Sequence, residues 1–278
     1  MDDFKNRVSD YKLPLIILGI CCLLMAILLV RETETEEVPS GQIVAEACYG
    51  VPVLNYHKIE NKHHSLSVPI ADFEQHMAWL SERGYHTITP DELYAFITEG
   101  KALPDNPVMI TFDDGYSDNY LNAYPIMKKY GFTGTIFVVT SFLGKYNGYM
   151  TWEQAKELSD NGFSIESHTI SHKSLTELTD DQLREELRES RQVLADKLGK
   201  SADYLAYPTG TYNLHIAQMV KEAGYKAAFT IRYDNVSRDT NVYAIERVPI
   251  FHTEHTNRDF LDRLDYGPLY SKLGWVKN

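Results

Sequence analysis

The sequence predicts an α/β protein, a parallel (β/α) barrel of about seven strands preceded by one transmembrane helix. Helix-like and strand-like segments alternate along residues 51–278, which is typical of a parallel sheet covered by helices. Seven or eight strand-like segments favour a closed barrel over an open sheet. Before them, residues 13–30 form an uncharged apolar stretch that is long enough to cross a bilayer.

The flanks of the apolar stretch predict its orientation. Three basic residues precede it and four glutamates follow it, so residues 1–12 are expected to be a cytoplasmic tail. Residues 31–50 are acidic and are interpreted as an extracellular stalk, which carries an extracellular domain over residues 51–278. We therefore expect a single-pass protein of the cell membrane. A cleaved signal peptide is the alternative, but the run is long for one and no small-x-small site follows closely.

Charge and cysteine content restrict the class of protein. The net charge of -12 argues against nucleic acid and anionic lipid as partners, and it is compatible with a neutral polymer. Cys48 is the only cysteine outside the apolar stretch, so a disulfide within the outer domain is excluded. A domain of this size can bury enough apolar surface to be stable without one, and we expect it to act as a monomer.

The elements of the outer domain follow from local patterns. Four helix-like segments end in a glycine and an aromatic residue before a strand, in residues 81–85, 128–132, 159–163 and 221–225. The clearest helix is expected over Asp180–Leu198, because Thr179 and Gln182 form a capping box and Gly199 ends it. Its leucine stripe is interpreted as core packing. Strands are expected at 51–56, 86–88, 107–112, 135–140, 163–167, 204–207, 226–230 and 242–251.

Two motifs at the ends of predicted strands carry the chemistry. Asp113 and Asp114 follow an apolar run, and burying two neighbouring carboxylates is costly unless a metal or hydrogen bonds offset them. His168 and His172 follow another strand. One carboxylate with two histidines can hold a metal ion with open positions, and the second carboxylate is left free as a base. All four residues fall where a β/α barrel has its active site.

The chain resembles the NodB-homology polysaccharide deacetylases (carbohydrate esterase family 4) over residues 51–264. Residues 111–115, 168–172 and 207–210 look like the first, second and third motifs of that family. The segment Ala206-Tyr207-Pro208 resembles the branch that acts on poly-N-acetylglucosamine. The resemblance implies a distorted (β/α) barrel that removes acetyl groups from N-acetylated sugars.

The resemblance also implies roles for particular residues. Asp113 would be the general base, and a divalent metal ion, expected to be Zn²⁺, would be held by Asp114, His168 and His172. The third motif would line the substrate site through Tyr207, Pro208, Thr209 and Gly210, with the Thr209 N–H as a donor to the oxyanion. A plain turn at this motif is the alternative.

Two catalytic positions depart from the family pattern. Many members have an arginine before the third motif, where this chain has Ala206, and Arg247 is the candidate to replace it. A surface arginine is the alternative. Three histidines compete as general acid: His57, which ends an early predicted strand and is favoured, His252 and His255; a different acid is the remaining alternative.

Three aromatic residues are further candidates. Trp152 follows a loop that contains Gly and Tyr residues, and it is a candidate for stacking on a sugar ring; packing inside the barrel is the alternative. Tyr146 and Tyr149 in the same loop are candidates for contact with the polymer.

The leading hypothesis is a membrane-anchored, metal-dependent N-deacetylase. Its substrate would be a surface polymer that contains N-acetylglucosamine, such as poly-N-acetylglucosamine, peptidoglycan or a chitin-like chain. An iron oxygenase with two histidines and one carboxylate is a second class, and the additional Asp113 argues against it. A non-catalytic glycan-binding protein with the same fold is a third, and the intact acid pair argues against that.

Overall fold

The computed structural model describes residues 50–265, and within that range the strands form one large parallel sheet and one small one. The large sheet has the order β10-β1-β5-β6-β7-β8-β9, and β4 pairs with the beginning of β5. Its strands are β1 (Val53–Tyr56), β4 (His86–Thr87), β5 (Pro107–Asp114), β6 (Thr135–Val138), β7 (Ser164–Ser167), β8 (Tyr204–Ala206), β9 (Ala227–Phe229) and β10 (Val248–Pro249). The small sheet pairs β2 (Lys58–Ile59) with β3 (Ser67–Val68).

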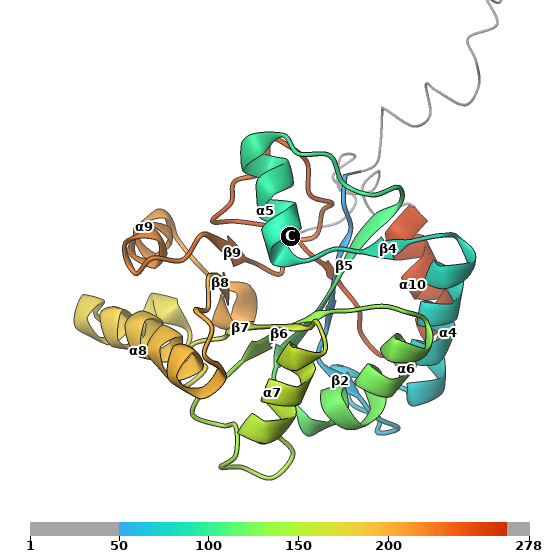
Figure 1. The fold of residues 1–278 in the computed structure, drawn as a ribbon, viewed down its shortest axis with the longest axis horizontal. Coiled ribbons are helices and arrows are strands. Elements are labelled where there is room, and N and C mark those ends of the chain that lie inside the picture. Colours follow the sequence, from blue (N-terminus) through green and yellow to red (C-terminus); the bar gives the residue numbers. More distant parts are fainter. Residues whose placement is uncertain (1–49, 266–278) are drawn as a thin grey trace, which may run out of the picture. The chain divides into compact units, whose positions relative to one another are not determined.

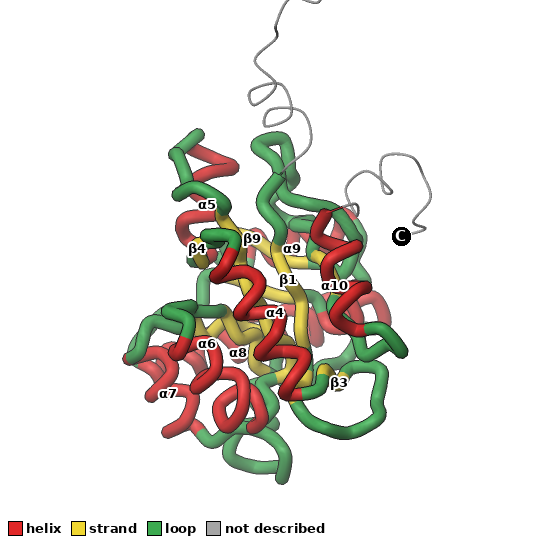
Figure 2. The backbone as a smooth tube through the Cα atoms, turned by 90° about the vertical axis from the view of Figure 1, so that its right-hand side faces the viewer, coloured by secondary structure: helices red, strands yellow, loops and turns green. Residues whose placement is uncertain are grey.

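Helices surround the large sheet, as two perpendicular views show (Figures 1 and 2). They are α4 (Ile70–Glu82), α5 (Pro90–Glu99), α6 (Tyr124–Lys129), α7 (Trp152–Asp160), α8 (Asp180–Leu198), α9 (Leu214–Glu222) and α10 (Thr256–Asp265). Shorter helical turns occur at Asn119–Ala123, Leu175–Glu177 and Pro208–Gly210. Most helices connect successive parallel strands, as the alternating sequence pattern predicts.

One late segment joins the two ends of the sheet. Ile245 pairs with Phe229 at the end of β9, and three residues later Val248 pairs with Leu54 of β1. The expected strand over residues 242–251 is therefore reduced to the two residues of β10, because the segment crosses from one neighbour to the other. This parallel sheet with helices outside it is consistent with a distorted (β/α) barrel.

The four predicted helix–glycine–aromatic joints have one common geometry. Gly84, Gly131, Gly162 and Gly224 all have positive φ, between 67° and 91°. At each joint the N–H of the aromatic residue donates to a carbonyl five residues earlier, as Phe163 does to Leu158. This bond satisfies a carbonyl that the end of the helix would leave without a partner. The joint then turns the chain into the next strand.

The helix α8 has the bounds that its sequence predicts. The Thr179 side chain accepts a hydrogen bond from the Gln182 N–H, the Gln182 side chain accepts one from the Thr179 N–H, and Gly199 ends the helix with a left-handed conformation. The leucine stripe is buried, as predicted, through Leu183, Leu187, Leu194 and Leu198. The same buried face carries Glu186, which contacts the candidate site.

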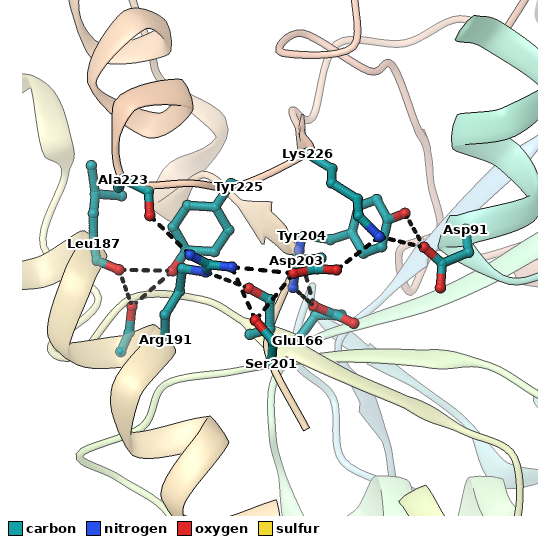
Figure 3. Close-up of polar contacts among 12 residues, drawn as sticks. Asp91, Glu166, Leu187, Arg191, Ser201, Asp203, Tyr204, Ala223, Tyr225 and Lys226 are labelled. Carbon is teal, nitrogen blue, oxygen red and sulfur yellow. Dashed lines mark hydrogen bonds and ion pairs between the residues drawn. The ribbon is translucent and has the colours of Figure 1, made fainter. Parts of the chain in front are cut away.

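A polar network joins the strands at the ends that lie away from the predicted motifs (Figure 3). Asp203 precedes β8 and accepts from Arg191 of α8 and from Lys226, which precedes β9. Lys226 also contacts Asp91 of α5. Glu166 of β7 accepts two hydrogen bonds from the backbone at the start of β8. The network ties three neighbouring strands to two helices, and it lies away from the strand ends that carry the predicted motifs.

The predicted membrane segment and stalk lie outside the described residues. Within residues 50–265, no helix is both long enough and apolar enough to cross a membrane.

Candidate active site

The two neighbouring carboxylates have different surroundings because they are consecutive residues at the end of β5. Side chains alternate between the two faces of a strand. Asp113 lies on the same face as Met109 and Thr111, toward the cluster of buried residues inside the sheet. Asp114 follows on the other side, and its φ of 75° turns it toward the two histidines. The alternation gives each acid its own partners.

Arg247 holds Asp113 with two parallel hydrogen bonds. Its Nη1 lies 2.8 Å from Oδ1 and its Nη2 lies 2.7 Å from Oδ2, and both side chains are buried. Arg247 is itself fixed by the carbonyl of Thr230, at 2.7 Å from its Nε, and Asn55 adds a third donor to Asp113 at 3.0 Å. Such paired contacts fix both the position and the plane of a carboxylate.

The charge state of Asp113 follows from these contacts. Burial alone would raise the pKa of this carboxyl, but the charge and hydrogen bonds of the Arg247 guanidinium outweigh burial and hold the pKa well below its usual range. The carboxylate is therefore ionised at neutral pH. Arg247 is therefore not a surface arginine, which was the alternative: its side chain is fully buried and contacts the candidate base Asp113.

Asp114, His168 and His172 offer three ligand atoms within 4.8 Å of one another. Asp114 Oδ1 lies 3.5 Å from His168 Nε2 and 3.2 Å from His172 Nε2. The Nδ1 of His168 lies 2.8 Å from the carbonyl of Ala206 and must donate to it, so its Nε2 carries a lone pair. Burial lowers the pKa of His168 despite the two aspartates and keeps the ring neutral. Converging acceptor atoms of this kind fit a divalent cation.

The loop that carries the two histidines is held by α8. Glu186 of that helix accepts hydrogen bonds from the backbone N–H groups of Ile170 and Ser171, at 2.8 and 3.0 Å, and from the Ser171 hydroxyl. These bonds fix a strained turn, because Thr169 and His172 both have positive φ. Among the described residues only five other than glycine have positive φ, and four of these lie in the motifs, at Asp114, Thr169, His172 and Thr209.

The third motif forms a tight turn directly after β8. Thr209 is exposed with φ 61°, whereas the Tyr207 and Pro208 side chains are buried and shape the turn. The Tyr207 hydroxyl donates to the carbonyl of Tyr243 at 3.0 Å, so this side chain is engaged in packing. Gly210 is required, because a Cβ there would lie 2.2 Å from the Ile231 side chain. The turn thus presents Thr209 at the same end of the sheet as the two other motifs.

The structure distinguishes two of the histidines that compete as general acid. His57 follows β1 directly, and the charges that act on it are those of Asp113, Asp114 and Arg247. Burial lowers the pKa of His57, and the two carboxylates partly oppose this. The His252 ring instead contacts that of His63, with 5.4 Å between ring centroids. The geometry therefore favours His57.

Trp152, the candidate for stacking on a sugar ring, packs against the core. Trp152 is the first residue of α7 and packs against the hydrophobic core, with Lys197 above its ring. Core packing therefore accounts for the position of Trp152, and stacking on a sugar remains a prediction.

The sequence analysis missed Asn55 and Glu186. Asn55 precedes His57 by two residues and lies in the strand expected at 51–56, so strand alternation was the signal that could have indicated it. Glu186 contacts a loop 15 residues earlier in the chain, and only its position on the buried stripe of α8 could have suggested a role.

Comparisons with known proteins identify the family of the chain. A family model described as "Polysaccharide deacetylase" matches residues 100–228. YxkH of Bacillus subtilis (strain 168), whose name places it among the polysaccharide deacetylases, is 38% identical over 221 residues, which are 80% of this chain and 78% of that protein. A poly-beta-1,6-N-acetyl-D-glucosamine N-deacetylase of Staphylococcus aureus (strain MRSA252) is 30% identical over 197 residues, covering 66% of this chain and 68% of that one.

A solved structure extends the similarity to the fold. The Streptococcus pyogenes deacetylase PplD, in complex with acetate, superposes with a TM-score of 0.74 at 27% identity and covers 78% of this chain and 99% of its own. The resemblance seen in the sequence motifs is confirmed. The chain belongs to the polysaccharide deacetylases, a family of hydrolases.

Proposed function

We propose that the protein removes N-acetyl groups from a surface polysaccharide that contains N-acetylglucosamine, by metal-dependent hydrolysis that releases acetate. The observation that carries the proposal is the separation of the two acids. Asp114 lies with two histidines in a set that fits a metal ion, while Asp113 lies on Arg247 and Asn55. A binding protein needs no second, separately held carboxylate, so the arrangement favours catalysis over the glycan-binding alternative.

Different residues would carry out different steps of amide hydrolysis. Asp114, His168 and His172 would hold the ion, with Zn²⁺ the preferred candidate for a set of nitrogen and oxygen ligands. A bound divalent ion would polarise the amide carbonyl and make water a better nucleophile. Asp113 accepts the proton of the attacking water, and Arg247 keeps its carboxylate in position.

The later half of the reaction needs a donor to the oxyanion and an acid. The Thr209 N–H is proposed as the donor, because the third motif presents this residue at the same end of the sheet. His57 is proposed to protonate the leaving amine, because an amine leaves readily only in its neutral form.

The substrate and the location complete the proposal. The similarity to an N-deacetylase of poly-beta-1,6-N-acetyl-D-glucosamine supports a polymer of that class, and peptidoglycan is the second candidate. Residues 13–30 would anchor the protein in the cell membrane, with the catalytic domain outside the cell and the protein acting as a monomer.

Matched variants of the two acids test the proposal. Asp113→Asn is expected to keep one equivalent of metal and to lose about 100- to 10,000-fold in turnover, because only the base is removed. Asp114→Asn is expected to lose metal and turnover together. Metal content by elemental analysis and acetate release from an N-acetylglucosamine oligomer are the measurements. Equal metal loss in both variants, or near-normal turnover of Asp113→Asn, would contradict the assignment of roles.

A further inference from the structure

Four aromatic side chains form a continuous row next to the candidate metal ligands. The row, which we call the aromatic row, consists of Tyr116, Tyr149, Phe142 and Tyr146. We infer that the aromatic row is a binding subsite for the sugar rings that neighbour the N-acetylglucosamine unit being deacetylated. This inference rests on the proposed function and adds the surface that recognises a polymer rather than a single sugar.

The row leads step by step from the ligand Asp114 to the surface. Tyr116 lies two residues after Asp114, and its hydroxyl interacts with that carboxylate. Its ring stacks on Tyr149 with 5.0 Å between centroids, and Tyr149 contacts Phe142 at 5.0 Å. Phe142 contacts Tyr146 at 5.3 Å, and 49% of Tyr146 is exposed. A bound chain could therefore extend along the row from the reacting unit outward.

The backbone fixes the aromatic row relative to both metal-ligand loops. On one side Tyr116 and Tyr149 form an antiparallel bridge, and the Met150 N–H donates to the Gly115 carbonyl at 3.0 Å. On the other side the N–H groups of Thr140 and Ser141 donate to carbonyls of the loop that carries His168 and His172, both at 3.1 Å. A loop that is bonded to both neighbours holds its rings at a fixed place beside the reaction.

The chemistry of the row matches a pyranose. Sugar rings present faces of C–H groups that pack on aromatic rings, while their hydroxyl groups need polar partners at the edge. Tyrosine offers both a flat apolar face and a hydroxyl. Lys58, the residue after His57, lies 4.3 Å from the centre of the Tyr116 ring and adds a donor at the inner end of the row. Rigid aromatic side chains also lose little entropy when they bind.

Chain-length dependence tests the inference. With the full-length protein, kcat/KM for acetate release is expected to rise from the N-acetylglucosamine dimer to longer oligomers. Tyr146→Ala and Tyr149→Ala should each reduce the value for long oligomers at least about fivefold, mainly through KM, so that the rise of kcat/KM with chain length becomes smaller. Tyr146→Phe should restore the ring contact. Tyr130→Ala is the control, because Tyr130 lies at the end of α6, at the opposite ends of the strands.

Binding without turnover separates this inference from the proposed function. Calorimetric titration of long oligomers into Asp113→Asn, with and without Tyr146→Ala, measures the subsite even if no acetate is released. Weaker binding in the double variant supports the aromatic row as a subsite. Unchanged binding and an unchanged length dependence in the tyrosine variants would overturn the inference, and acetate release by the wild-type protein would still support the deacetylase.

Discussion

At the scale of single residues, the two histidines considered as general acid have different surroundings. His57 directly follows β1, and the charges of both aspartates and of Arg247 act on its pKa. His252 follows β10, contacts the ring of His63, and its backbone N–H donates to the Ser65 carbonyl. Two histidines that follow neighbouring strands thus face different groups, and the charge of the candidate base Asp113 acts on His57.

We predict that His57→Ala lowers turnover strongly, while His252→Ala has little effect. Loss of a general acid typically costs about 100- to 10,000-fold. The measurement is the pH profile of acetate release for both variants on one oligomer, and the basic limb of the profile should disappear only in His57→Ala. If His252→Ala removes that limb and His57→Ala leaves it intact, the acid is His252.

At the scale of elements, α8 holds the loop that carries two of the candidate metal ligands. The buried Glu186 of this helix holds the strained turn between the two histidines through three hydrogen bonds. Residues that orient the ligands of a metal commonly affect its affinity about 10- to 100-fold. The helix therefore combines a packing role, through its leucine stripe, with a role in the arrangement of His172.

We predict that Glu186→Gln weakens metal binding about 10- to 100-fold, because an amide can accept from fewer N–H groups than a carboxylate and leaves the turn less constrained. The exposed Glu189 on the same helix provides the control as Glu189→Gln. Competition with a metal-binding dye measures the affinity of both variants. Equal affinity in Glu186→Gln and Glu189→Gln would contradict the positioning role of Glu186.

The elements also show what local sequence can predict. The bounds of α8 follow from Thr179, Gln182 and Gly199, because caps act within one turn of the helix. The four joints follow from glycine and its aromatic neighbour for the same reason. The strand over residues 242–251 was predicted too long, because its partner changes from β9 to β1 within a few residues and no local pattern records that change.

The residues of the candidate site likewise fall into those that local sequence predicts and those that it does not. Asp113, Asp114, His168 and His172 could be identified because each motif is contiguous and ends a strand. The partners Asn55 and Glu186 meet them only in the fold, where Asn55 lies 58 residues before Asp113 in the chain. Arg247 could be proposed only because many family members have an arginine before the third motif and this chain has Ala206 there. Contacts across such separations depend on the register of strands, which the sequence pattern does not specify.

At the scale of the whole molecule, the polar network of Figure 3 couples stability to pH through Glu166. Burial raises the pKa of this carboxyl to about 8, although hydrogen bonds from Ser164 and from the start of β8 oppose it. The folded pKa therefore exceeds the ordinary value of 4.5. The stability that proton binding provides is fully present below that value and is lost as the pH rises toward about 8.

We predict that Glu166→Gln makes the folding stability of the protein less sensitive to this rise in pH. The neutral amide can accept from the backbone of Asp203 or Tyr204 without a buried charge, so the variant should gain stability relative to wild type between about pH 5 and about pH 8. Urea unfolding at both pH values measures the difference, with Glu185→Gln on the exposed face of α8 as the control. A difference that does not change with pH would contradict the raised pKa.

As a whole, the protein is proposed to act as a metal-dependent N-deacetylase. The most direct test is the release of acetate from a long N-acetylglucosamine oligomer by the full-length protein, before and after removal of metal by a chelator. We predict that the native protein releases acetate, that chelation abolishes the release, and that added Zn²⁺ restores it. Release that continues unchanged in the metal-free protein would contradict the claim, as would a zinc-loaded protein that binds the oligomer and releases no acetate.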